Sequence, residues 1–327
     1  MRVLVTGSSG HLGEAAMRVL AARGVEALGL DILPGPYTGM VGSIADPSVA
    51  RAAMAGVGAV LHAATLHKPH VGTHGKAAFV ETNVTGTLVL LEAALEAGVG
   101  AFVLTSTTST FGDALVPPPG APAAWIDESV VPVPKNIYGV TKTAAEDLCQ
   151  LAHRDRGLPV VVLRTSRFFP EADDDPAVRA AFADENLKAN EFLYRRVDIE
   201  DAVAAHMAAL ERAPAIGFAK YVISATTPFE PADLARLRTD APAVVEARLP
   251  GVAAIYAARG YRMAPVVDRV YANGRARAAL GWRPAWDFAR VLRQIAAGEP
   301  IGSDLARAVG AKGYHGEAFA DGPYPVA

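Results

Sequence analysis

The sequence has 327 residues, 51% of them hydrophobic, and a formal net charge of −3. This length and apolar content suit one large α/β domain or a core domain with a smaller cap. The negative net charge argues against a nucleic-acid partner, because proteins bind nucleic acids through a basic face. The single cysteine, Cys149, excludes a disulfide within the chain. Because we find no signal-peptide pattern and no apolar run long enough to span a bilayer, we expect a cytoplasmic protein with no membrane partner.

Short apolar runs alternate with longer amphipathic stretches through the first half of the chain. The runs predict strands over Arg2–Thr6, Val25–Leu30, Ala59–His62, Ala101–Ser106 and Pro159–Leu163. Helical spacing predicts helices over His11–Arg23, Pro47–Met54, Lys76–Glu96 and Tyr138–Arg154. Such alternation is typical of a parallel sheet with helices on both faces, so we predict a doubly wound α/β fold.

The pattern is less regular after Leu163. A helix over Glu200–Arg212 and a strand over Lys220–Ser224 return to it. The acidic run Asp173–Asp175 reads as a solvated turn, and Gly310–Ala327 as an irregular tail. Short helices are predicted over Asn273–Leu280 and Asp287–Ala297.

A glycine-rich turn follows the first predicted strand and opens the first predicted helix. Its glycines let the chain turn tightly and let backbone N–H groups approach a pyrophosphate, toward which the helix points its positive end. Asp31 ends the second strand, where a carboxylate binds ribose hydroxyls and repels a 2′-phosphate. We therefore predict an NAD site rather than a turn without a ligand. The contacts predicted in the turn are Gly7, Gly10, His11, Leu12 and Gly13.

Tyr138 and Lys142 lie four residues apart, so on a helix they share one face. A lysine beside a tyrosine, with a positively charged nicotinamide nearby, favours the phenolate and lowers the tyrosine pKa. The phenol can then exchange a proton with a substrate hydroxyl while hydride moves to or from the nicotinamide. The same spacing also occurs on ordinary helix faces, but here a strand ending in hydroxyl residues precedes it, which favours catalysis.

Several motifs occur in an order that identifies a family. With the Gly-x-x-Gly-x-x-Gly spacing of its turn, the chain resembles the extended short-chain dehydrogenase/reductase superfamily, and within it the NAD-dependent epimerase/dehydratase family, from Arg2 to about Arg290. The segments that carry the resemblance are Thr6–Gly13, Asp31, Leu61–Ala64, Asn83–Thr87, Phe102–Gly112, Tyr138–Lys142, Arg196–His206 and Leu280–Pro284.

The resemblance implies further cofactor contacts. Ser43 and Ile44 match the place where an Asp-Ile pair usually meets the adenine, with serine replacing the acid. Ala63 and Ala64 are expected under the ribose and phosphates. Asn83 is expected to support the site from the long helix, and Lys142 to hold the nicotinamide ribose as well as to tune Tyr138.

The resemblance also assigns the partner hydroxyl. Matched from Phe102 to Gly112, the family's catalytic Ser/Thr falls on Thr107, with Ser106 as the neighbour if the register slips. Sugar dehydratases of the family carry an Asp-Glu pair after this position, where this chain has Thr108 and Ser109. Neither can act as a carboxylate acid or base, so we rank dehydration below epimerisation and dehydrogenation.

The substrate side matches the family less well. Only Arg164 of the nucleotide-sugar signature after the fifth strand is present. Arg195 and Arg196 lie close to the family's diphosphate-binding arginine, and they either hold a phosphate or carboxylate or form a solvated pair near Asp198 and Glu200. The residues proposed to contact the substrate are Thr108, His67, Arg167, Arg195 and Arg196.

Three histidines, His67, His70 and His74, follow the third predicted strand. Loops at this end of a strand line the ligand cleft, so contact with substrate is favoured over a metal site, and a plain surface loop is the other reading. We predict no metal site.

These features predict a Rossmann-type NAD-binding core in residues 1–166, to which residues 197–226 return, and a smaller, interleaved substrate-binding region in residues 167–196 and 227–327. We expect NAD-dependent hydride transfer on a sugar or nucleotide sugar, with an epimerase slightly favoured by the resemblance. The alternatives are a dehydrogenase or reductase of a small carbonyl or sugar acid, and a non-catalytic NAD-sensing protein. The resemblance further implies a homodimer built on Lys76–Glu96 and Tyr138–Arg154.

Overall fold

Seven parallel strands form one sheet in the order β3-β2-β1-β4-β5-β7-β8. The computed structural model describes residues 2–313, 315 and 319, so most of the tail predicted over Gly310–Ala327 lies outside the described residues. The strands are β1 (Arg2–Thr6), β2 (Ala27–Asp31), β3 (Met40–Val41), β4 (Val57–His62), β5 (Ala101–Thr107), β7 (Val160–Thr165) and β8 (Phe218–Ile223).

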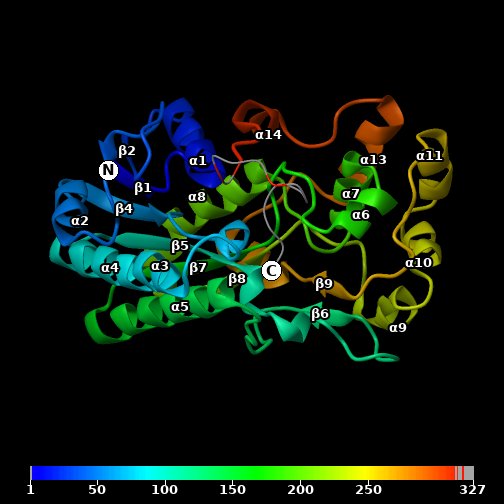
Figure 1. Cartoon of the computed structure of the whole chain (residues 1–327), viewed down its shortest axis with the longest axis horizontal. Helices are drawn as coiled ribbons and strands as arrows, with labels where there is room; N and C mark the ends of the chain where they lie inside the picture. Colours follow the sequence, from blue (N-terminus) through cyan, green and yellow to red (C-terminus); the bar gives the residue numbers. More distant parts are fainter. Residues whose placement is uncertain (1, 314, 316–318, 320–327) are drawn as a thin grey trace.

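Helices cover both faces of this sheet (Figure 1). Because side chains alternate along a strand, Val3 and Val5 point to one face while Leu4 points to the other. The first face packs against α1 (His11–Ala22), α8 (Ile199–Ile216), α12 (Gly274–Leu280) and α14 (Asp304–Val309). The second face packs against α2 (Pro47–Ala53), α4 (Gly86–Glu96) and α5 (Ile137–Arg156). The predicted doubly wound fold is confirmed.

The long helix predicted over Lys76–Glu96 is present but irregular. It consists of α3 (Lys76–Phe79), a π-helical segment η2 (Val80–Thr85) and α4. By length and composition alone this helix could cross a membrane, so our expectation that no apolar run is long enough is wrong. Of its most apolar window, 44% is buried inside the fold, as in a core helix with one exposed side.

A smaller region lies beyond the carboxyl ends of the strands, at the right of Figure 1. Its two-stranded parallel sheet pairs β6 (Ala124–Ile126) with β9 (Arg269–Tyr271). Its helices are α6 (Pro176–Ala181), α7 (Asp184–Glu191), α9 (Leu234–Leu237), α10 (Ala241–Arg248), α11 (Val252–Ala258) and α13 (Phe288–Ala297). Single 3-10 turns are η1 (Lys68–His70), η3 (Thr108–Thr110), η4 (Asp113–Leu115) and η5 (Pro231–Asp233).

Candidate active site

The glycine turn joins β1 to α1 with no room for side chains at two of its glycines. A Cβ added at Gly13 would lie 1.9 Å from the carbonyl oxygen of Gly7. Gly7 has a φ of 75°, and a Cβ there would lie 2.7 Å from the amide nitrogen of Ala64. The turn therefore packs directly against Ala63 and Ala64 at the end of β4, and the N-terminus of α1 faces the same edge of the sheet.

Asp31 lies beside this turn. Its carboxylate accepts hydrogen bonds from the backbone N–H of Ser9 and of Leu33, each at 2.9 Å. These bonds fix the acid at the carboxyl end of β2, where the ribose hydroxyls of a dinucleotide would lie if its pyrophosphate met the turn.

Ser43 and Ile44 behave differently from each other. Ser43 is exposed, and its hydroxyl accepts a hydrogen bond from the N–H of Ala45 at 3.2 Å. Ile44 is buried against Gly86, where an added Cβ would lie 2.7 Å from the isoleucine Cδ1. Ile44 thus packs against the first residue of α4, whereas Ser43 stays at the surface.

Asn83 links the loop after β4 to α5. Its side-chain oxygen accepts from the N–H of Leu66 and the hydroxyl of Thr65, both at 2.9 Å. Its amide group donates to the Leu66 carbonyl at 2.9 Å and to the Thr141 hydroxyl at 3.0 Å. An asparagine has two donors and two acceptor positions, so all four are used. Asn83 therefore supports the residue next to Lys142 and has no bond left for a cofactor.

Tyr138 lies in the first turn of α5, close to the end of β5. The Thr107 hydroxyl lies close enough to the phenol to influence its pKa. Burial raises the pKa of Tyr138 to about 12, and the Thr107 hydroxyl opposes this rise. Burial also lowers the pKa of Lys142 to about 8, against the charges of Cys149 and Glu146. Without a cofactor, burial therefore dominates the pKa of the phenol, and the lowering expected from Lys142 together with a charged nicotinamide stays a prediction.

The end of β5 distinguishes Thr107 from Ser106. The hydroxyl of Ser106 donates to a carboxylate oxygen of Glu146 at 2.6 Å, away from Tyr138. Thr107 is on the opposite side of the strand, where its hydroxyl accepts from the N–H of Ser109 at 3.1 Å and meets the phenol. This alternation favours Thr107 as the hydroxyl partner of Tyr138.

Glu146 is a feature that the sequence analysis missed. Its carboxylate is fully buried and pairs with Arg164 at 2.7 Å and with Lys220 at 3.1 Å. It lies one helical turn after Lys142, so a Tyr-x-x-x-Lys-x-x-x-Glu spacing was the available signal. The network holds β5, α5, β7 and β8 together behind the catalytic residues.

The three candidate arginines lie together, but they are paired within the protein. Arg195 and Arg196 contact the Glu191 carboxylate at 2.7 Å and 2.9 Å. Arg167 contacts Asp173 at 2.7 Å and approaches Glu191 at 3.9 Å. Arg196 is only 4% exposed. The reading of Arg195 and Arg196 as a solvated pair is wrong, because α7 brings Glu191 between them.

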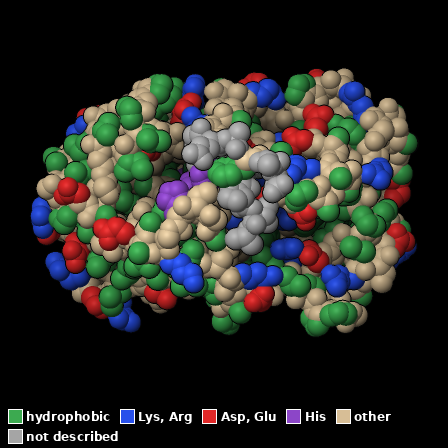
Figure 2. Space-filling model, in the orientation of Figure 1, with side chains coloured by type: hydrophobic (Ala, Val, Ile, Leu, Met, Phe, Trp, Pro, Cys, Tyr) green, Lys and Arg blue, Asp and Glu red, His purple; other side chains and the backbone are tan. Residues whose placement is uncertain are grey.

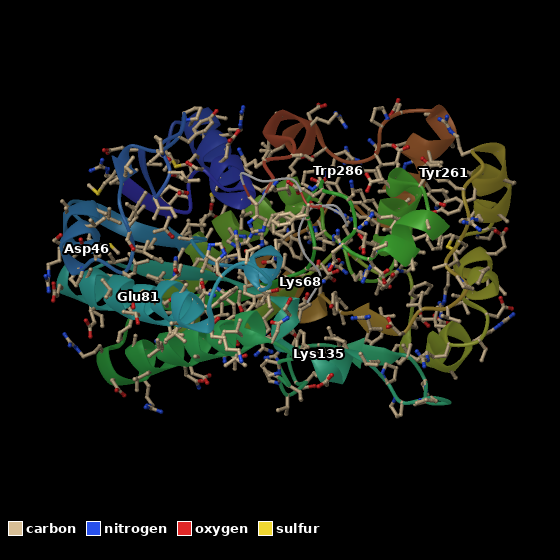
Figure 3. The ribbon with its side chains drawn as sticks, viewed as in Figure 1. Asp46, Lys68, Glu81, Lys135, Tyr261 and Trp286 are labelled. Carbon is tan, nitrogen blue, oxygen red and sulfur yellow. The ribbon has the colours of Figure 1, made fainter. Side chains whose placement is uncertain are left out.

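The acidic run is also more buried than predicted. Asp173 and Asp174 are each 6% exposed, and only Asp175, which caps α6, is exposed. Asp174 pairs with Lys68 at 2.5 Å, and Lys68 lies near the middle of the molecule (Figure 3). The solvated-turn prediction is wrong because Asp173 and Asp174 neutralise cations from two other segments.

His67 lies beside the catalytic tyrosine. Its ring centroid is 6.5 Å from that of Tyr138 and 5.3 Å from that of Phe169. Burial, together with the charges of neighbouring histidines, lowers the pKa of His67 well below its usual value. Among residues 2–313, 315 and 319, no three His, Cys, Asp or Glu side chains are placed to share a metal ion. A neutral His67 can still donate or accept a hydrogen bond through its ring, and the ring itself limits the space beside Tyr138.

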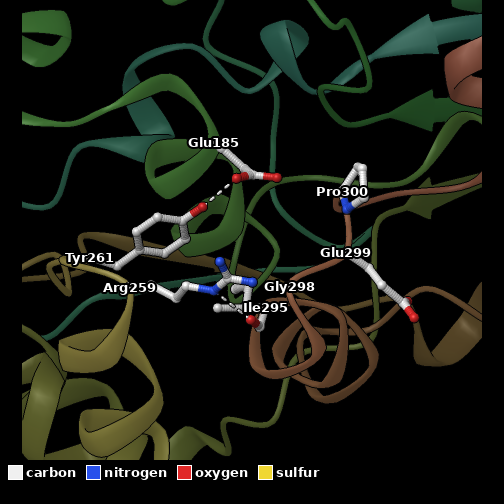
Figure 4. Close-up of a pocket in the computed structure, with 7 residues that line it drawn as sticks. All are labelled: Glu185, Arg259, Tyr261, Ile295, Gly298, Glu299 and Pro300. Atoms are coloured by element: carbon white, nitrogen blue, oxygen red, sulfur yellow. Dashed lines mark hydrogen bonds between the residues drawn. The ribbon is translucent and has the colours of Figure 1, made fainter.

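A separate hollow lies at the ends of α7, α11 and α13 (Figure 4). Its volume is about 200 Å³. The Tyr261 hydroxyl donates to Glu185 there, and Arg259 donates to the Ile295 carbonyl at 2.8 Å. These polar groups satisfy one another, and none of the lining residues is a predicted site residue. The lining residues are Glu185, Arg259, Tyr261, Ile295, Gly298, Glu299 and Pro300.

Comparison with known proteins identifies relatives of this fold and site. The family model described as "NAD dependent epimerase/dehydratase family" matches residues 3–223. The chain is 35% identical over 175 residues to a UDP-glucose 4-epimerase of Rhizobium meliloti, covering 50% of each chain. It is 34% identical over 193 residues to a dTDP-glucose 4,6-dehydratase of Streptomyces niveus, covering 52% of this chain and 55% of that one. The chain thus spans about half of the length of these curated relatives.

Solved structures are similar over more of the chain. A short-chain dehydrogenase/reductase superfamily protein from Agrobacterium tumefaciens, solved with bound NAD, is 26% identical with a TM-score of 0.63. The match covers 91% of this chain and 96% of that one.

The arginine cluster leads to a prediction about stability. Burial would raise the pKa of Glu191, but Arg195, Arg196 and Arg167 outweigh it and lower the pKa from its usual 4.5 to about 2. A carboxyl group with a lowered folded-state pKa stabilises the protein above its unfolded pKa, and this stabilisation is lost as the pH falls from 4.5 toward 2. We expect Glu191→Gln to lower the free energy of unfolding by about 3 kcal/mol at pH 7 and by less than half as much near pH 3.

Denaturant unfolding at the two pH values measures this difference. Glu230→Gln is the matched control, because Glu230 pairs with Arg248 at 2.9 Å but is mostly exposed. Its effect should stay below about 1 kcal/mol at either pH. Equal effects of the two substitutions at pH 7 would contradict the assignment.

Proposed function

We propose, since the chain belongs to the NAD-dependent epimerase/dehydratase family, that it moves a hydride between NAD and a carbinol or carbonyl carbon of a sugar or nucleotide sugar. The observation that carries this proposal is the buried pair of hydroxyls on Tyr138 and Thr107, with Lys142 one turn along α5. Two hydroxyls that meet at one point can both bond a single substrate oxygen placed between them.

The residues around the glycine turn fit the cofactor. Gly7 lets the turn pack against Ala64 and Gly13 lets the turn close on itself, so the start of α1 lies at the edge where a pyrophosphate would bind. Asp31 is held where it can accept the ribose hydroxyls. When bound, NAD accepts or supplies the hydride. Asn83 stays a supporting residue because its hydrogen-bonding groups are already used.

Each catalytic residue then has a defined task. Tyr138 gives or takes the proton of the reacting hydroxyl, and Thr107 orients the same oxygen. Because the pKa of the phenol is raised by burial, a nearby positive charge is needed to favour the phenolate, and Lys142 on the same helix face is the residue that supplies it. Lys142 would also hold the nicotinamide ribose.

For the overall reaction we propose epimerisation, in which one carbinol carbon of the sugar, held at Tyr138 and Thr107, would be inverted by oxidation and re-reduction. Kinship with UDP-glucose 4-epimerases supports this choice. We rank a dehydratase below it, although one relative is a dTDP-glucose 4,6-dehydratase, because Thr108 and Ser109 offer no carboxylate next to Thr107.

A second candidate is a dehydrogenase or reductase of a smaller sugar or sugar acid. It is favoured by the internal pairing of Arg195 and Arg196 with Glu191, since these are the residues expected to meet a diphosphate. A substrate without a diphosphate would leave this pairing undisturbed.

Replacing the catalytic hydroxyl tests the enzyme against the non-catalytic, NAD-sensing alternative. We expect Tyr138→Phe to lower kcat by a factor of about 10² to 10⁴, the usual contribution of a positioned acid or base, and to leave NAD affinity nearly unchanged. Steady-state kinetics and NADH fluorescence titration measure the two quantities. Tyr261→Phe, in the separate hollow, is the control and should behave like the wild type. Unchanged turnover in Tyr138→Phe would refute the catalytic assignment.

The amount of NADH formed during turnover distinguishes the possible net reactions. Protein should be incubated with NAD and a panel of UDP-sugars, dTDP-sugars, free sugars and sugar acids, with products analysed by NMR. We expect an inverted sugar with no net NADH formation. Stoichiometric NADH with one substrate would instead establish the dehydrogenase, and loss of water would establish a dehydratase.

We also propose a homodimer built on α4 and α5. Leu88 and Val140, on these two helices, are 39% and 50% exposed, which is a large exposure for apolar side chains. We expect light scattering to give twice the 34.1 kDa chain mass, and Leu88→Glu with Val140→Glu to halve it. Val131→Glu, at a site that is 74% exposed on another loop, should leave the mass unchanged. A monomeric wild type would contradict the proposal.

A further inference from the structure

The chain after α14 turns back onto the edge of the sheet that carries the site. The first of its contacts are made by Lys312, whose ammonium pairs with Glu14 of α1. The backbone N–H of Lys312 donates to Glu171, in the loop after β7, at 3.0 Å. The ring of His315 lies 3.0 Å from the Pro69 carbonyl oxygen in the loop after β4. One short segment therefore reaches three separate elements.

These three elements follow the carboxyl ends of β1, β7 and β4, which meet at one edge of a parallel sheet. Ligands of open α/β sheets bind at this edge. The glycine turn, Thr107 and Tyr138 lie there as well. Figure 2 shows histidine side chains gathered near the centre of this face, in keeping with the ring contact of His315 with His70 at 5.3 Å. The segment that carries Lys312, Gly313 and His315 thus borders the predicted cofactor groove.

Glu171 joins this segment to the glycine turn. One of its carboxylate oxygens accepts from the ring of His11 at 2.8 Å, from the N–H of Lys312 at 3.0 Å and from the N–H of Gly313 at 3.2 Å. His11 directly follows Gly10 and begins α1. A single buried side chain therefore links the start of α1 to the C-terminal segment.

The ionised state of Glu171 strengthens its hydrogen bonds to the C-terminal segment. Burial would raise its pKa, but the hydrogen bond and charge of His11 outweigh burial and lower the pKa to about 2. The carboxylate is therefore ionised at neutral pH, and hydrogen bonds to an ionised acceptor are stronger than those between neutral groups.

A second ion pair joins two of the same loops. Lys68, in the loop after β4, pairs with Asp174, in the loop after β7. This ion pair links the loop that contacts His315 to the loop that contains Glu171. The C-terminal segment therefore contacts two loops that are joined to each other.

We propose that the C-terminal segment carrying Lys312, Gly313 and His315 is the outer wall of the cofactor groove, and that Glu171 is the positioning residue that holds it there. NADH then leaves the protein only when the Glu171 bonds to this segment open. The inference rests on the cofactor site proposed above, and it concerns the residence time of the cofactor rather than the chemical step.

The release rate of NADH tests this inference without any turnover. Full-length protein is loaded with NADH and chased with excess NAD, and the loss of protein-bound NADH fluorescence is followed by stopped flow. We expect Glu171→Gln to release NADH roughly tenfold faster, the change that corresponds to about one lost charge-assisted bond. Lys312→Met removes the contact with Glu14 but keeps the His11–Glu171 bond, and it should also speed release. Lys135→Met, which breaks an ion pair with Asp113, is the matched control.

A double variant separates a shared action from two unrelated effects. If Glu171 and Lys312 act through the same segment, Glu171→Gln with Lys312→Met should release NADH more slowly than the product of the single effects predicts. Thermal unfolding of each variant checks that the fold is intact, and Lys312→Met keeps the test valid if Glu171→Gln fails to fold.

Two results would overturn the inference in distinguishable ways. Wild-type release rates in both single variants, with hydride transfer intact, would remove the wall and leave the proposed function standing. Failure of the wild-type protein to bind NADH at all would remove the cofactor site and the wall together.

Discussion

The reversal of strand order beside β1 is the constraint on which the site depends. The chain leaves β1 toward β2 and β3 and then crosses back to β4, so the turn after β1 faces the loop after β4 across a crevice. Gly7 makes that approach close, since a Cβ there would meet Ala64, and Gly13 lets the turn itself close, since a Cβ there would meet the carbonyl oxygen of Gly7. Because every strand of the sheet is parallel, the hydroxyl at the end of β5 and the start of α5 meet at the same edge.

Burial dominates the pKa values of Tyr138 and Lys142 at this edge, whereas charged partners dominate those of the buried carboxylates. Tyr138 and Lys142 share a helix face, but burial moves their pKa values in opposite directions, upward for the phenol and downward for the ammonium. Glu171 and Glu191 are held ionised by cationic or histidine partners. The site thus keeps its fixed negative charges paired, and its phenol stays protonated until a cofactor and substrate change the surroundings of Tyr138.

The sequence predicted the parts of the structure that depend on local periodicity. Strands such as Arg2–Thr6 and the glycine turn were foreseeable because apolar runs and glycine spacing are local signals. The approach of Arg167 to Glu191 was not, because a backbone bridge between Arg167 and Arg196 brings together two segments that are far apart in the sequence. The contact of Glu171 with Lys312 was still less accessible, since the two residues come from opposite ends of the substrate region. Site residues that act through tertiary pairing therefore escape a reading based on motifs.

The proposed wall of the cofactor groove bears on the net reaction, and the paired arginines bear on the substrate. An epimerase must keep its reduced cofactor through both half-reactions, so a groove closed by Glu171 suits a cycle in which the cofactor does not leave. Net oxidation needs exchange of the cofactor at every turnover, which the same wall would slow. The arginines affect the choice of substrate instead, because the Glu191 carboxylate already neutralises part of their positive charge, which weakens their attraction for a diphosphate. Together these arguments favour tight retention of NAD and only a weak contribution of Arg195 and Arg196 to substrate binding.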